Sequence, residues 1–130
     1  MKAAIANLLD QESQVDDIDL AALTAFEEIN LPGEPDVVVE LIDLYVTDGA
    51  ERVSQIKHAA VTADRILLKK ASHSFKGSSG SLGFHQIVAL CEQFERVEAQ
   101  EDLNALGHRL ESRFAVVCAA LRELRESRVG

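Results

Sequence analysis

His73 is the residue whose type and neighbours point most directly to chemistry. It lies in a run of small and polar residues, residues 71–83. On a helix that advances by about 100° per residue, Leu68, Phe75 and Leu82 fall on the side opposite this histidine. We therefore expect His73 to point away from the core, where its imidazole, in the neutral form, is open to a partner and can act as a nucleophile.

Lysine side chains border this histidine in an otherwise acidic protein. The formal net charge is −9, yet no Asp or Glu occurs between residues 65 and 91. Helical spacing places Lys69, Lys70 and Lys76 beside His73. We expect Lys76 in particular, helped by the other two lysines, to stabilise a phosphoryl group held on the imidazole.

Two glycines lie along the same face of this predicted helix, at Gly77 and Gly80. Each costs about 1 kcal/mol relative to alanine in a helix interior, so their presence needs a reason. One reason is access, because a missing side chain lets a bulky group or another backbone approach the imidazole. The alternative is that the glycines permit close packing of another helix.

Apolar spacing predicts the elements that position this face. A short helix over about 18–28 ends at Leu31-Pro32-Gly33, and four longer helices follow over about 35–60, 63–82, 84–100 and 102–127. Pro35 suits the first turn of one helix, and Gly83 suits the end of another. We predict an all-α fold, an antiparallel up-down four-helix bundle with a short N-terminal helical extension over residues 1–17 and the bundle domain over 18–130.

The run His73-Ser74-Phe75-Lys76-Gly77, followed by Leu82-Gly83 and by Leu90-Cys91-Glu92-Gln93-Phe94-Glu95, resembles the signature of histidine-containing phosphotransfer (HPt) domains. The resemblance extends to the Gly33-Glu34-Pro35 entry and the helix through Tyr45, so it spans roughly residues 18 to 125. Phe84 stands where many members have a small residue.

The resemblance implies a phosphocarrier of a multistep phosphorelay. His73 would accept a phosphoryl group from the aspartyl phosphate of a receiver domain, in a response regulator or hybrid histidine kinase, and pass it to another receiver. The implied docking surface surrounds His73, with Gly77, Gly80, Ser79, Ile42 and Tyr45 as its candidates. The chain has no glycine-rich phosphate-binding loop, so we expect no ATP site, no kinase activity and no cofactor; magnesium is expected on the receiver.

Composition excludes several other classes of protein. The negative charge argues against a nucleic-acid partner, and no apolar run reaches the length of a membrane span. Cys91 and Cys118 lack the spacing of a metal knuckle or redox pair. We expect a cytoplasmic monomer without a membrane partner.

Two rival functions stay open at this point. A bundle of this kind could dock onto a kinase or response regulator without carrying phosphate. It could also house a metal, but the Glu-x-x-His pairs of di-iron bundles are absent, because the residues three before the four histidines are Gln55, Lys70, Leu82 and Ala105.

Overall fold

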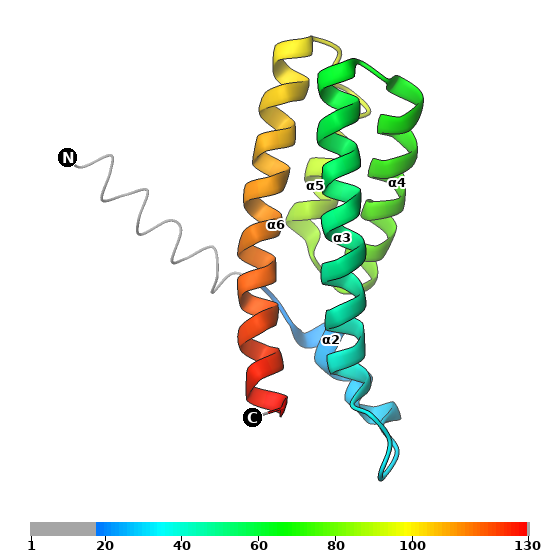
Figure 1. Ribbon diagram of the computed structural model, residues 1–130, viewed down its shortest axis with the longest axis vertical. Helices are drawn as coiled ribbons and strands as arrows, with labels where there is room; N and C mark the ends of the chain where they lie inside the picture. Colours follow the sequence, from blue (N-terminus) through cyan, green and yellow to red (C-terminus); the bar gives the residue numbers. More distant parts are fainter. Residues whose placement is uncertain (1–17, 130) are drawn as a thin grey trace, which may run out of the picture.

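Two long antiparallel helices run the length of the protein, whose computed structural model describes residues 18–129. They are α3 (Val37–Thr62) and α6 (Gln100–Val129). The shorter α4 (Arg65–Ser81) and α5 (His85–Gln93) lie beside them, so the four helices run alternately up and down as an antiparallel bundle (Figure 1). The described residues contain no strand, which confirms the predicted fold class.

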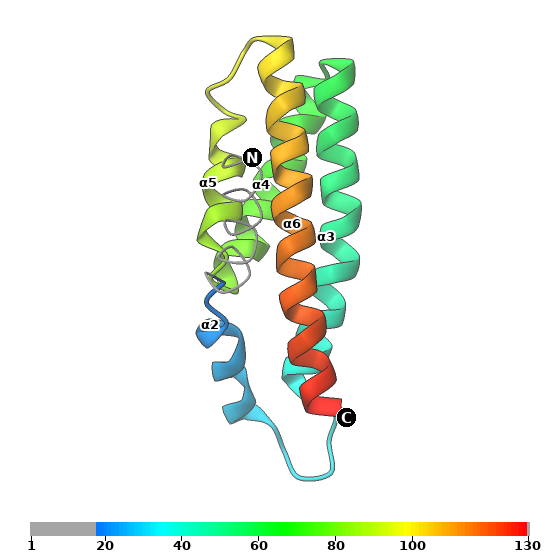
Figure 2. The same ribbon diagram turned by 90° about the vertical axis from the view of Figure 1, so that its left-hand side faces the viewer.

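The described chain enters the bundle through two short turns, α2 (Ala21–Thr24) and the 3-10 turn η1 (Ala25–Ile29). Figure 2 shows them below α5, where α6 extends beyond the shorter helix. Leu23 is fully buried there, so α2 continues the core toward this end. Residues 1–17 lie outside the described residues, and the predicted extension and the boundary at residue 18 stay predictions.

Four aromatic rings form the centre of the core. The Tyr45 ring lies 5.8 Å from Phe75, 5.1 Å from Phe84 and 6.0 Å from Phe114 between centroids. Phe75 and Phe114 meet edge to face at 5.6 Å, an arrangement that aromatic pairs favour. The cluster joins α3, α4, α6 and the start of α5. Among residues 18–129, no helix is long and apolar enough to cross a membrane.

Side-chain caps and positive-φ residues set the helix ends. Asp36 caps α3 by accepting from the Val38 N–H at 3.0 Å, so α3 begins after the cap and Pro35 lies just outside it. Asp64 caps α4 by accepting from the Leu67 N–H at 3.1 Å. The chain turns at Gly83, whose φ of +84° favours glycine, as predicted for the end of this helix.

Helix α5 ends earlier than the predicted residue 100. It stops at Gln93, and Phe94 turns into the core instead of continuing the helix. The following loop is held by Arg65 at the start of α4, whose guanidinium donates to the carbonyls of Val97 at 3.1 Å and Glu98 at 2.8 Å. These bonds satisfy loop carbonyls that a longer helix would have paired itself.

Candidate functional site

Helix α4 presents His73 on the outer side of the bundle. Its buried residues are Leu68, Ala71, Ser72, Phe75 and Ser79, whereas His73 and Ser74 are exposed. The buried Ser72 hydroxyl donates to the Leu68 carbonyl at 2.7 Å, so its burial leaves no polar group without a partner. The outward orientation predicted for His73 is therefore observed.

The three lysines near His73 differ in their surroundings. Lys69 and Lys70 are exposed on a helix without an acidic residue. Lys76 is half-buried, and its Nζ lies 3.5 Å from Oε1 of Glu92 on α5. A partly exposed ion pair of this kind is weak, so a phosphoryl group of charge near −2 on the imidazole could compete for the same ammonium group.

The two glycines of this face also differ. A Cβ added at Gly77 would meet nothing within 4 Å. A Cβ added at Gly80 would lie 3.6 Å from Val88 Cγ2 of α5, which is ordinary contact. The alternative that the glycines permit close packing of another helix therefore finds no support at Gly77, where the surface one turn beyond His73 is bare. It finds some support at Gly80, which faces α5.

Three predicted docking residues lie in the core instead of at the surface. Ile42 is 2% exposed, Tyr45 4% and Ser79 0%. The Tyr45 hydroxyl and Ser79 Oγ are hydrogen-bonded to each other at 2.8 Å, and burial raises the Tyr45 pKa above its usual value. The prediction that these side chains contact a partner is wrong, because the bundle itself covers them.

An exposed apolar residue near His73 was missed by the sequence analysis. Ile66 is 72% exposed and lies seven residues before His73, hence two turns earlier on nearly the same face of α4. The spacing of seven residues between Ile66 and His73 indicates that the two share a helix face, and this was the signal in the sequence. Beside this face is a hollow of about 350 Å³, lined by Arg65, Leu68, Lys69, Ser72, Phe94 and Glu95.

Among residues 18–129, the other cysteine and histidine side chains do not form a second reactive centre. Cys91 is buried, and burial raises the pKa of its thiol to about 12, which makes it a poor nucleophile. His58, His85 and His108 are exposed on three other helices. In the part of the chain that the structure describes, no group of three or more His, Cys, Asp or Glu side chains could hold a metal ion.

Comparison with protein families matches the Hpt domain over residues 40–127, a segment that contains His73. The chain belongs to the Hpt domain family. Among solved structures it is similar to histidine-containing phosphotransfer protein B (HptB) from Pseudomonas aeruginosa PAO1, with a TM-score of 0.71 and 25% sequence identity, covering 85% of this chain and 95% of that chain. No curated protein matches the sequence.

These findings confirm the resemblance drawn from the sequence. The chain is a histidine phosphotransfer protein of phosphorelay signalling. Hpt domains are phosphocarriers, and in phosphorelays they interact with receiver domains.

Proposed function

We propose that His73 carries the phosphoryl group, which it accepts from the aspartyl phosphate of one receiver domain and passes to the aspartate of another. The observation that supports this most is the exposure of the imidazole on a helix face without carboxylates, next to the open surface at Gly77. The open space at Gly77 leaves room for a receiver to approach the ring from that side.

The transfer step exchanges one bond for another at phosphorus. The lone pair of Nε2 forms the P–N bond as the P–O bond to the aspartate breaks, and that electron pair leaves with the carboxylate. Both the aspartyl phosphate and the phosphoimidazole are high-energy species, so the exchange is reversible. Lys76 stabilises the phosphoryl oxygens on His73, and Lys69 and Lys70 add positive potential one turn earlier.

Charge stabilisation in this step comes mainly from the receiver. We propose that magnesium belongs to the receiver's acidic pocket and that this chain needs no cofactor, since phosphoryl transfer depends on positioning and charge neutralisation. The sequence has no glycine-rich phosphate-binding loop, which supports the absence of kinase activity.

The proposed partners are receiver domains, and we propose that each binds this chain as a monomer. Burial of the apolar stripes of α3 to α6 within one chain supports a monomer. Both cysteines are free thiols, as expected of a protein from the reducing cytoplasm, where we place this reaction.

The proposal is tested by phosphotransfer from a labelled, phosphorylated receiver domain. We expect the wild-type chain to gain label that is lost in acid and kept in alkali, as phosphohistidine is. His73→Gln should gain none. His85→Gln removes another exposed histidine and serves as the matched control, which should gain label at the wild-type rate.

Two outcomes would contradict the proposal. If His73→Gln gained as much label as wild type, another residue would be the acceptor. If the wild-type chain bound receivers but gained no label from any member of a panel, the docking module without phosphate would be the better description.

A further inference from the structure

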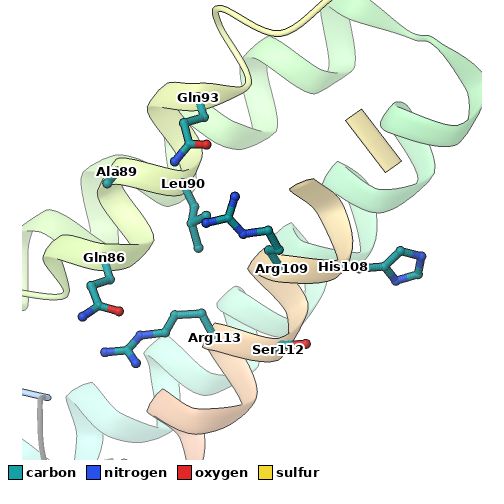
Figure 3. A pocket seen from close by; sticks show the side chains of 8 residues that line it. All are labelled: Gln86, Ala89, Leu90, Gln93, His108, Arg109, Ser112 and Arg113. Atoms are coloured by element: carbon teal, nitrogen blue, oxygen red, sulfur yellow. The ribbon is translucent and has the colours of Figure 1, made fainter. Parts of the chain in front are cut away.

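A groove of about 470 Å³ lies between α5 and α6, on a different pair of elements from the helix that bears His73 (Figure 3). The side chains of Arg109 and Arg113 extend from α6 toward α5, and Gln86 and Gln93 of α5 face them. His108 also borders the groove, but its ring points away from it.

The lining of this groove suits carboxylates. Among the described residues, its lining contains no Asp or Glu, although the protein has a net charge of −9. Arg113 is 9% exposed, and its charge acts more strongly at such a site than in open water. Guanidinium groups match carboxylates through paired hydrogen bonds, glutamine amides donate as well, and Leu90 offers an apolar wall for side-chain methylenes.

The described chain begins at one end of this groove. Ile18 lines an adjoining hollow together with Gln86 and Arg113, and both of these also line the groove. The segment that precedes Ile18 carries its acidic residues close by in sequence, at Asp10, Glu12, Asp16 and Asp17.

The length of this segment is sufficient to reach along the groove. An extended stretch of residues 10–17 spans up to about 26 Å, whereas α5 rises about 10 Å between Gln86 and Gln93. Attachment to the same chain also gives the segment an effective concentration in the millimolar range, well above that of a separate acidic peptide.

We propose that the groove between α5 and α6 is the docking site of this protein's own acidic segment, residues 10–17, whose carboxylates bind Arg109 and Arg113. The proposal is independent of phosphotransfer by His73, so either one can fail alone.

The test uses the full chain and the NMR signals of the groove. In the neutralised variant, all four acidic residues of the segment are changed to Asn or Gln. We expect the side-chain amide signals of Gln86 and Gln93 and the Nε–H signal of Arg109 to shift. The matched control neutralises four exposed acids elsewhere, at Glu28, Glu51, Glu123 and Glu126, and should leave these signals in place.

A synthetic peptide of residues 10–17 then distinguishes a self-docked groove from an open one. It should bind the neutralised variant and return the groove signals toward their wild-type positions, and Arg109→Gln should weaken this binding. The wild-type chain should bind the peptide at least roughly tenfold more weakly, because the attached segment competes.

Two results would overturn the proposal. Groove signals that are the same in wild type and neutralised variant would show that the segment does not dock there. Equal peptide affinity for the two proteins would show a groove open to the acidic segment of another partner.

Discussion

At the scale of single residues, the site depends on open space beside His73. The bare surface at Gly77 lies one turn from the imidazole, and the nearest lysine on that side, Lys76, is drawn toward α5 by Glu92. Access and charge at the phosphoryl group can therefore be changed separately, by one substitution each.

Gly77→Gln should slow transfer from a phosphorylated receiver by a factor on the order of ten or more, because the new side chain occupies the approach to the imidazole and misplaces the reacting groups. Helix content should stay the same or rise, since glutamine favours helix over glycine. Transfer rates and circular dichroism measure the two effects. Unchanged transfer would show that the glycine does not provide access.

Glu92→Gln should shift the phosphoryl equilibrium toward His73 by roughly two- to fivefold, the range expected for a partly exposed ion pair. The carboxylate that competes for the Lys76 ammonium group is removed, so the ammonium is available to the phosphoryl oxygens. The measurement is the equilibrium distribution of label between this chain and one receiver domain.

Two further variants separate this effect from a general change of charge. Glu51→Gln removes an exposed carboxylate from α3 and should leave the equilibrium unchanged. In the double variant Glu92→Gln/Lys76→Met the gain should disappear. A gain that survives the loss of Lys76 would contradict the role given to this ion pair.

The sequence correctly predicts whether a side chain faces the core or the solvent where its position along a single helix determines this. The outward position of His73 follows from angles along α4 alone. Spacing within each helix also favours the core for Tyr45, which shares the apolar stripe of α3, and for Ser79, which lies four residues after the buried Phe75. It does not specify the hydrogen bond that joins these two side chains between α3 and α4. The same holds for the contact between Lys76 and Glu92, whose partners belong to different helices.

At the scale of elements, Asp36 joins the beginning of α3 to the end of α6. It caps α3, and Arg128 donates to its two oxygens at 2.6 and 3.2 Å. The Asn30 amide donates to Oδ1 at 3.1 Å. The hydrogen bond from Arg128 is the main cause that lowers the pKa of Asp36 from 3.8 to about 2.

Asp36 should therefore make stability depend on pH in acid. A carboxyl group whose pKa is lowered by folding stabilises the protein above its unfolded pKa, and this stabilisation is lost as the pH falls from about 4 to about 2. Asp36→Asn should lower the free energy of unfolding at neutral pH and flatten its dependence in this window. Urea unfolding between pH 2 and 6 measures both effects.

The control for this prediction is Glu123→Gln, which removes an exposed carboxylate of α6 that forms no ion pair with any described residue. Its pH profile should follow that of wild type. If Asp36→Asn and wild type lost stability in parallel between pH 4 and 2, the ion pair with Arg128 would not be the cause.

The sequence locates elements well where a residue marks their ends and less well elsewhere. Gly83 marks the turn after α4, and the structure places it at φ +84°. The end of α5 at Gln93 carries no glycine or proline. It results from the burial of Phe94 and from the bonds of Arg65 to the following loop, and both are tertiary interactions.

At the scale of the whole molecule, the helices pack closely at Gly49 of α3, a residue that a search for apolar side chains does not include. The buried stripe of α3 contains Tyr45 and Val53, which are eight positions apart, and Gly49 lies midway between them on the same stripe. Gly49 is buried because the rings of Phe114 and Phe75 occupy the space where its side chain would be. A pattern search for apolar residues does not detect a contact of this kind.

Gly49→Ala should therefore destabilise the fold, by up to about 2 kcal/mol. The added Cβ would lie 2.6 Å from Cε1 and 2.7 Å from Cζ of Phe114, whose ring is packed against Phe75 and Tyr45. Overpacking of this kind costs about 1–3 kcal/mol, against a gain in helix propensity of about 1 kcal/mol. Gly77→Ala is the matched control, because it makes the same change where space is open and should stabilise the protein. Urea unfolding of both variants decides the matter: if Gly49→Ala were as stabilising as Gly77→Ala, the close approach of α3 to the aromatic cluster would not hold.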